Sequence, residues 1–511
     1  MALYIRVLFY SIIILLLYVI MYNKGALIFP ESVLTFFIII SISQYFINKV
    51  YLRVNDDNKY LIYLRNLNIL HCLSLCLLIS LYKILINYKV IDLVLNFDIS
   101  NDNLIIECLR FIILFIYLII TIFYYNDYRK SIQGNAVKDI MFYLLIIFTI
   151  NIFYVKNLIF FYIYIECIYF LLFILIISLL TSNMDNKLKH IENVKVIIYY
   201  YILNILVGLL FLMWVSFTLM SVGDIDFELL SSIKHIIIYK SDNNMFYFFC
   251  FTLFFICKLS LFPFYSIVIQ FLKIIPKIFA IIYLTNIKII IFYFFIKILS
   301  IYFIIEDFVS IIFVSLCIIN LFIFLSKVWR EYNTYNLFLH SSIFNITNII
   351  ITTLDISVDN NIYISLIFFY YFIGTISMII TFTVVNNINT NFLYPIRINN
   401  GYIHNASKVG IYNFFSLLLI MGLAPSIMFM IKLGFYDFNI GNILETLSVY
   451  SSLSLIFIIL STIAYLPLGI KYMVEYSTIN KIFIGNKLTV NYFILLLIIF
   501  SLLITPLFLI L

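Results

Sequence analysis

Residues 244–264 read NMFYFFCFTLFFICKLSLFPF, an apolar run interrupted by one charged side chain, Lys258. Nothing from Asn244 to Cys257 is charged, so a helix over this run places the Lys258 amine on the order of 20 Å from its start. That depth lies inside the hydrocarbon core of a bilayer, which is about 30 Å thick. A charge at that depth is costly, and such residues usually face a bundle interior, a partner or a water path. The run therefore predicts a membrane helix that carries a functional lysine.

The whole chain has the composition of a membrane protein. Of its 511 residues, 65% are hydrophobic and 11% are charged, which excludes a soluble globular protein. Apolar stretches of about 20 residues recur from end to end, so the expected fold is all-α, a polytopic transmembrane helical bundle with almost no extramembrane domain. The basic residues behind the net charge of +7 are scattered in short loops and do not indicate nucleic-acid binding.

Hydropathy predicts 15 membrane spans along the chain. They cover residues 4–22, 26–47, 61–86, 104–125, 139–156, 158–181, 194–221, 244–264, 277–300, 306–327, 335–354, 361–386, 409–433, 446–472 and 489–511. Residues 4–22 resemble a signal peptide, but no cleavage site of small residues follows them. They are therefore expected to be a retained helix.

The loop charges predict the orientation in the membrane. Most loop lysines and arginines fall on the side of the N-terminus, whereas acidic residues such as Asp98 and Glu306 gather on the other side. The basic loop residues on that other side are Lys24, Lys89, Lys156, Lys234 and Lys240. By the positive-inside rule, the N-terminus faces the matrix or cytoplasm and the C-terminus faces away.

Two more charges have comparable positions, Glu166 in FYIYIECIYFLLF and Lys288 in IIYLTNIKIIIFYFF. Two lysines also lie close to a proline that frees a backbone carbonyl, Lys258 before Pro263 and Lys432 after Pro425. These two lysines are five spans apart, an odd number, which predicts two inverted halves with broken helices at matching positions, as in transporters.

Metal and cluster sites are not indicated. The cysteines contain no CxxC and no paired spacing, and all fall in apolar segments. They are at positions 72, 76, 108, 167, 250, 257 and 317. We therefore expect buried thiols, with no Fe–S or zinc ligand set.

Several motifs occur in an order that is typical of one family. The motifs are Pro30-Glu31 at the start of the second span, Glu166 in the sixth, Lys258-Leu-Ser-Leu-Phe-Pro263-Phe264-Tyr265, Lys288, His340-Ser341-Ser342-Ile343, and Gly422-Leu-Ala-Pro425 leading to Lys432. Together they resemble subunit 2 of NADH:ubiquinone oxidoreductase (respiratory complex I), an antiporter-like membrane subunit, over residues 26–511. Tyr265 replaces a histidine of the family motif, and the span at 4–22 is additional to the usual fourteen. Abundant Phe and Tyr beside 12 Gly suggest an AT-rich, divergent mitochondrial genome.

The resemblance implies a proton-translocating subunit that couples electron transfer from NADH to ubiquinone to proton pumping. The residues it implies for the proton path are Glu166, Lys195, Lys258, Lys288 and Lys432, with His340 as a further relay. Lys195 lies about a turn from the position where the family's sixth-helix lysine is expected. Because burial disfavours the charged form of a side chain, neighbouring Glu and Lys groups can switch each other's charge.

The resemblance also implies an organisation and a set of partners. The parts are an extra N-terminal helix (1–25), peripheral helices (26–138), two antiporter-like repeats (139–305 and 306–472) and a C-terminal helix (473–511). The chain would be a subunit of an H+-translocating NADH:ubiquinone reductase with no cofactor of its own. FMN, Fe–S clusters and ubiquinone are expected in partner subunits. Its neighbours would be other antiporter-like and small membrane subunits and lipids of the mitochondrial inner membrane.

Three alternatives stay open at this point. The sister subunit 4 is expected to have a glutamate where Lys432 stands and a His-x-Trp-Leu-Pro continuation where Tyr265 begins. A stand-alone cation/proton antiporter or a lipid-linked sugar flippase would work without a large assembly. In a purely structural subunit, the intramembrane charges would be ion pairs that hold helices together.

Overall fold

The computed structural model describes residues 102–123, 136–180, 187–232, 245–302, 307–328 and 334–354. Within these ranges the chain is helical, and the one extended pairing is an isolated bridge between Asn157 and Asp226. The all-α prediction is therefore confirmed for this part of the chain. The predicted spans before residue 102 and after residue 354, with Pro425 and Lys432, lie outside the described residues.

The chain divides into two compact units, residues 1–155 with 167–184, and residues 156–166 with 185–511. In the first unit, α4 (Asp102–Phe123) packs antiparallel against α6 (Ala136–Asn151), which the 3-10 turn η1 (Ile152–Tyr154) continues. The ring of Tyr117 meets that of Phe142 edge-on at 5.9 Å. Arg110 is fully buried on α4 and donates a hydrogen bond to the hydroxyl of Tyr154. A buried charge in this unit is thus held by an amphipathic aromatic side chain.

The second unit begins with the start of α7 (Leu158–Leu180) and includes α8 (Lys187–Val222) and the short α9 (Phe227–Ser232). Two backbone hydrogen bonds tie the chain before α7 to the chain before α9. The amide of Leu158 donates to the carbonyl of Ile225 at 3.2 Å, and that of Phe227 donates to Lys156 at 2.8 Å.

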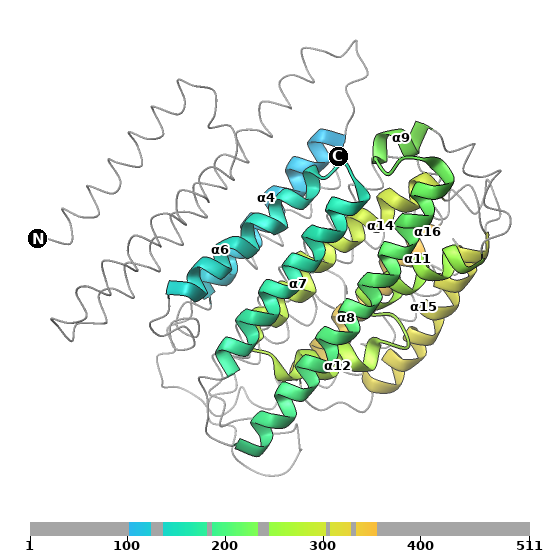
Figure 1. Cartoon of the computed structure of the whole chain (residues 1–511). Helices are drawn as coiled ribbons and strands as arrows, with labels where there is room; N and C mark the ends of the chain where they lie inside the picture. The colour runs from blue at the N-terminus through green and yellow to red at the C-terminus, as the bar shows by residue number, and fades with distance from the viewer. Residues whose placement is uncertain are drawn as a thin grey trace, which may run out of the picture. The chain divides into compact units, whose positions relative to one another are not determined.

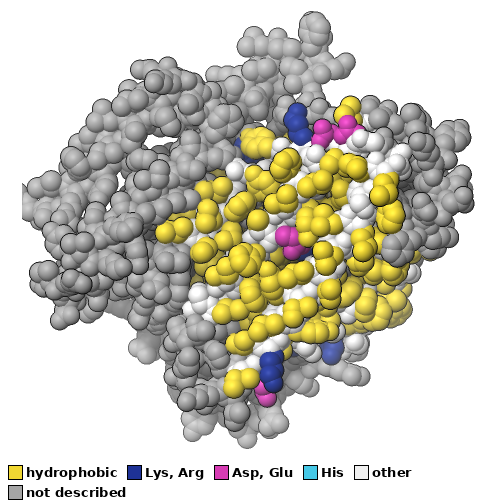
Figure 2. Space-filling view, viewed as in Figure 1, with side chains coloured by type: hydrophobic (Ala, Val, Ile, Leu, Met, Phe, Trp, Pro, Cys, Tyr) yellow, Lys and Arg dark blue, Asp and Glu magenta, His cyan; other side chains and the backbone are white. Residues whose placement is uncertain are grey.

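The 36-residue helix α8 has two contrasting faces. Its inner face, which includes Ile197, Val207 and Phe211, is buried. Its outer face carries exposed hydrophobic side chains at helical spacing, at Ile198, Ile202, Leu206, Leu209 and Met213. Figure 2 shows such side chains covering this face of the molecule, with an acidic group in their midst. A long helix that is apolar on its outer face suits lipid or another membrane helix.

The predicted span 244–264 is not one continuous helix. The helix α11 (Met245–Lys258) ends at the lysine, and α12 (Tyr265–Ile274) resumes after six residues and runs on to residue 274. Both helices pack against α8 (Figure 1). The break follows from Pro263, which has no N–H to donate to the preceding turn. Only α11 lies within the predicted span, and the whole of α12 lies beyond its predicted end at residue 264.

The next span is buried along most of its length. It consists of α13 (Lys277–Ile282), a single π-helical turn η2 (Tyr283–Ile287) and α14 (Lys288–Tyr302). After it come α15 (Asp307–Val328) and α16 (Thr334–Leu354), which pack on each other with the rings of Phe324 and Phe344 stacked at 4.2 Å.

Three helical segments of the described part are long and apolar enough to cross a membrane. They are Leu158–Ser178, Ile191–Ser221 and Ile278–Leu299. Most of residues 278–299 are buried, with Tyr293, Ile296 and Lys297 half-buried, so this segment lies at the centre of the second unit.

Candidate functional site

Two of the predicted site residues form an ion pair inside the second unit. The Lys258 amine donates a hydrogen bond to Oε1 of Glu166 over 3.2 Å. The Lys258 side chain is fully buried, and that of Glu166 is 19% exposed. Their positions follow from the local structure, because Glu166 lies midway along α7 and Lys258 is the last residue of α11. The two residues are therefore in direct contact.

Gly208 on α8 makes room for the Glu166 carboxylate. A Cβ atom at this position would lie 2.7 Å from Oε1 of Glu166, the same oxygen that accepts from Lys258, and 3.1 Å from the ring of Tyr162. A separation of 2.7 Å is shorter than real Cβ contacts, so any larger side chain has to displace the carboxylate. The glycine thus sets the distance between α8 and the ion pair.

The break after Lys258 is built from two unusual features. Ser260 has a φ of +65°, in the left-handed region that non-glycine residues seldom adopt. Its side chain is fully buried. Two residues later, the amide of Phe262 donates to Oδ1 of Asn320 on α15 at 3.1 Å instead of to the backbone. Asn320 therefore satisfies a donor that the interrupted helix leaves without an intrahelical acceptor.

Lys288 reaches into this break from the adjacent span. Its amine donates to the backbone carbonyl of Lys258 and to Oγ of Ser260, the latter over 2.5 Å. Lys288 is the first residue after the π turn and is fully buried. Single π turns inside α-helices are frequent at functional sites, because they change the direction of the side chains that follow. The Lys258 carbonyl is free to accept because the amide of Phe262, its partner in a continuous helix, donates to Asn320 instead.

An aromatic pair lies beside Lys288. The Lys288 amine is 4.8 Å from the ring centroid of Tyr283, and the hydroxyl of Tyr283 shares a hydrogen bond of 2.6 Å with that of Tyr200 on α8. The Tyr200 ring also stacks on Phe271 of α12 at 4.1 Å. Polar groups from α7, α8, α11 and the π-turn span thus gather around one break in an apolar bundle.

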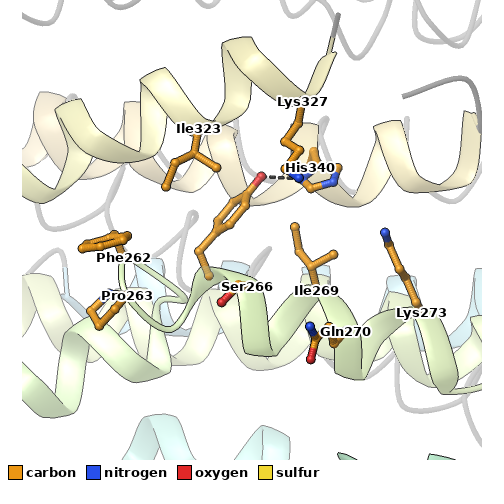
Figure 3. Close-up of a pocket in the computed structure, with 10 residues that line it drawn as sticks. Phe262, Pro263, Ser266, Ile269, Gln270, Lys273, Ile323, Lys327 and His340 are labelled. Atoms are coloured by element: carbon orange, nitrogen blue, oxygen red, sulfur yellow. Dashed lines mark hydrogen bonds between the residues drawn. The ribbon is translucent and has the colours of Figure 1, made fainter. Parts of the chain in front are cut away.

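A cavity of about 230 Å³ lies among α12, α15 and α16. Figure 3 shows its lining, from Phe262 and Pro263 at the break to Lys273, Lys327 and His340. The His340 side chain is buried and its Nδ1 atom shares a hydrogen bond with the hydroxyl of Tyr265. The cavity has room for several water molecules and connects the broken backbone with two exposed lysines.

The structure brings Glu166, Lys258 and Lys288 into one cluster but leaves Lys195 apart. Lys195 is exposed on α8, and 13 residues separate it from Gly208, which corresponds to roughly 20 Å of helix. The predicted order placed Lys195 between Glu166 and Lys258, whereas these two are in direct contact. Lys432 lies outside the described residues.

Sequence reasoning missed several polar residues of the site. Asn204, Asn320 and Ser260 are buried, each in a run of apolar residues, and that isolation is a signal that could have pointed to them. Tyr200 and Tyr283 gave no such signal, because tyrosine is abundant along the whole chain. Among the described residues no group of three or more His, Cys, Asp or Glu side chains could hold a metal ion.

Comparisons with known proteins identify the fold. No protein-family model matches the sequence, and no curated protein matches it significantly. A chain of the archaeal membrane-bound sulfane sulfur reductase, a respiratory membrane complex, superposes with a TM-score of 0.69 at 13% identity and covers 93% of this chain and 94% of its own length.

Two further structures are similar over most of their length. A chain of respiratory complex I from Thermus thermophilus has a TM-score of 0.60 and 12% identity, covering 93% of this chain and 96% of its own. A chain of the Mrp complex from Dietzia sp. has a TM-score of 0.60 and 14% identity, covering 90% and 81%. At these identities the likeness shows the fold alone. That fold is a polytopic membrane fold, which confirms the predicted class.

Proposed function

We propose that this chain is a proton-translocating, antiporter-like membrane subunit of a respiratory complex, and specifically subunit 2 of NADH:ubiquinone oxidoreductase. The observation that carries the proposal is the contact of Glu166 and Lys258 at a helix break that Lys288 also enters. If Glu166 and Lys258 were only a structural ion pair, the binding of Lys288 to the backbone carbonyl of Lys258 would have no purpose. Two titratable groups in contact, with the amine of a third bound to the adjoining backbone carbonyl, are the proposed pathway on which protons are passed.

The cluster couples charge between its members. Two unit charges about 4 Å apart interact by roughly 4 kcal/mol at an effective dielectric constant of about 20. The charge of Glu166 therefore acts directly on the amine of Lys258. Because Lys288 binds the Lys258 carbonyl, a movement of the break also moves the Lys288 amine. Charge and backbone position can thus be switched together, without a large displacement of whole helices.

The cavity beside the break supplies an aqueous route. It runs from Pro263, next to the cluster, to Lys273 and Lys327 at the helix ends. By the loop charges, those ends face the matrix or cytoplasm. His340, bound to Tyr265 in the cavity wall, is the proposed relay between the cavity water and the interior.

The remaining assignments of the proposal rest on the sequence motifs. Lys432 is the proposed exit-side relay, and Lys195, which is exposed on α8, is given no part in the proposed cluster. The electron-transfer cofactors FMN and Fe–S clusters, and ubiquinone, belong to partner subunits. The chain would reside in the mitochondrial inner membrane with its N-terminus in the matrix. Tyr265 and Lys432 favour subunit 2 over subunit 4.

The test is proton pumping by the intact complex that carries Lys258→Met. Methionine keeps the length of the side chain and removes the proton-accepting amine. We expect the complex to assemble and oxidise NADH, with protons moved per electron falling to background. Lys156→Met, at an exposed position, is the matched control and should pump normally. Normal pumping by Lys258→Met would return Lys258 to a structural role and overturn the proposal.

A stand-alone cation/proton antiporter is the second candidate, and one observation favours it. The chain of the Mrp complex superposes as well as the complex I chain does, with the same TM-score of 0.60. Native-gel fractionation separates the two functions. Migration in a megadalton assembly with NADH dehydrogenase activity supports the complex I assignment. Migration as a free monomer or small assembly with cation/proton exchange supports the stand-alone antiporter.

A further inference from the structure

A buried asparagine in the middle of α8 has polar atoms that no described residue satisfies. The side chain of Asn204 is 1% exposed, and neither its Oδ1 nor its Nδ2 atom has a hydrogen-bond partner in the described part of the chain. An amide carries two donors and an acceptor oxygen, and burying these unpaired is unfavourable. Such a group is commonly satisfied by an ordered internal water molecule.

The neighbours of Asn204 on α8 locate it relative to the site. Tyr200, one turn before it, stacks on Phe271 of α12. Phe211, about two turns after it, contacts Phe254 of α11 with ring centroids 4.3 Å apart. Asn204 shares the buried face of α8 with these two residues, so it lies at the level where α11 ends and α12 has not yet begun. The unpaired amide therefore faces the helix break.

Along α8, Asn204 lies between two residues that contact polar groups of the site, Tyr200 and Gly208. Tyr200 bonds Tyr283 beside Lys288, and Gly208 contacts Glu166, the partner of Lys258. Tyr200 and Gly208 are two turns apart, or roughly 12 Å along the helix axis, which is too far for a hydrogen bond. Asn204 stands midway, about 6 Å from each level. A single bridging water joins polar atoms roughly 5–6 Å apart, since each of its two hydrogen bonds spans about 2.8 Å.

We propose that Asn204 is a water-binding site that links the Tyr200–Tyr283 pair to the Glu166–Lys258 pair. The inference rests on the proposed proton-translocating function and adds a step to it. The amide keeps its own protons. It holds and orients water, and the O–H bonds of that water carry the proton between the two pairs. The link from α8 to the cluster is therefore a neutral residue inside the bundle rather than the lysine at its periphery.

The first test detects the water without reference to pumping. In a cryo-electron microscopy map of the assembled complex that resolves other internal waters, we expect a peak within 3.5 Å of an Asn204 amide atom. A dry, filled space around Asn204 in such a map would overturn the inference and would leave the role proposed for Lys258 untouched.

The second test compares two side chains of equal shape at this position. Asn204→Thr keeps a hydroxyl that can bind the water, whereas Asn204→Val replaces that hydroxyl with a methyl group. We expect Asn204→Thr to pump within about threefold of the unchanged protein and Asn204→Val to lose about tenfold in pumping rate, the order of magnitude of one lost hydrogen bond. The control for the chemical change is Asn193→Val, at a half-buried position near the start of α8, which should pump normally.

Each outcome of this comparison has one meaning. Equal pumping by Asn204→Thr and Asn204→Val overturns the water link, provided that Lys258→Met in the same preparation has lost pumping. If Lys258→Met pumps normally, the proposed function itself fails. Should Asn204→Val reduce the amount of assembled complex, Asn204→Ser and Asn204→Ala repeat the comparison with smaller side chains.

Discussion

Lys195 and Lys258 are two lysines of the same unit in opposite settings. Lys195 lies on a regular stretch of α8, with its side chain exposed. Lys258 is fully buried where α11 ends, and Lys288 follows a π turn in the neighbouring span. The buried amines are found where the backbone departs from a regular helix. An interrupted backbone leaves carbonyl groups that can bind an amine, whereas a continuous helix uses its carbonyls internally.

The comparison teaches which lysine can serve proton transfer. A long exposed lysine near the end of a span can place its amine in the interfacial region, so its charge needs no partner in the bundle. A buried lysine requires partners, and here Glu166 serves Lys258 while the Lys258 carbonyl and Ser260 serve Lys288. A role in proton transfer is therefore expected of the lysines that lie where the backbone departs from a regular helix.

The largest effect is expected from removing the charge of Glu166. Glu166→Gln keeps the size of the side chain and leaves the Lys258 amine without a carboxylate. We expect proton pumping by the assembled complex to fall roughly 100-fold, the order of magnitude of a lost acid–base group. Pumping is measured as acidification by proteoliposomes during NADH oxidation. Pumping within threefold of normal would mean that the buried pair is structural.

A smaller effect on proton pumping is expected from Gly208→Ala, which leaves both charges of the pair in place and acts on Glu166 only by steric contact. The added Cβ has to push Oε1 of Glu166 off its position, at a cost of about 1 kcal/mol for a strained rotamer. This corresponds to roughly a fivefold loss of pumping. Gly223→Ala is the matched control, because a Cβ there meets nothing within 4 Å. Its positive φ of +84° predicts lower thermal stability without a pumping defect. An equal pumping loss in both variants would contradict the steric argument.

Two substitutions of Ser260 separate backbone conformation from the hydroxyl. Ser260→Gly and Ser260→Ala both remove the acceptor of the Lys288 amine, so both should lower pumping to a similar extent, about threefold. Only Ser260→Ala keeps a side chain at a φ of +65°, and it should be less stable than Ser260→Gly by about 1 kcal/mol. Thermal unfolding of the purified complexes measures the difference. A pumping defect confined to one variant would show that the hydroxyl is not the acceptor that matters.

The smallest effect is expected from Lys195→Gln. The side chain is exposed and roughly 20 Å along α8 from the level of the ion pair, so pumping should stay within about twofold of normal. The same proteoliposome assay applies. A loss of pumping comparable to that of Glu166→Gln would place Lys195 on the proton path. It would show that a lysine on a regular helix can serve proton transfer as well as one at a helix break.

Much of the fold could be predicted from sequence because the membrane imposes a simple rule. Spans need about 20 apolar residues, and the predicted ranges 158–181, 306–327 and 335–354 agree with α7, α15 and α16 to within one residue at each end. The start of α8 was predicted seven residues late, because its first two turns are polar and hydropathy does not register them.

The candidate site was predicted only in part. The cost of an isolated charge at bilayer depth is enough to mark Glu166, Lys258 and Lys288. Hydropathy cannot show that a π turn precedes Lys288 or that Asn320 binds the amide of Phe262, since both depend on how neighbouring spans pack. Tyr200 and Tyr283 were hidden for a different reason, because in a chain with 42 tyrosines a pair of them carries no signal.

The sequence by itself determined that this chain is a helical membrane protein, roughly where its helices lie in the described residues, and that Glu166, Lys258 and Lys288 are isolated charges within apolar spans. It could do so because each of these properties depends on residues close together along the chain. Only the tertiary structure decided that Glu166 touches Lys258 directly, that Lys288 occupies the freed carbonyl and that Lys195 stays outside. Those contacts join residues up to 92 positions apart, and their distances are set by the packing of four helices around one break.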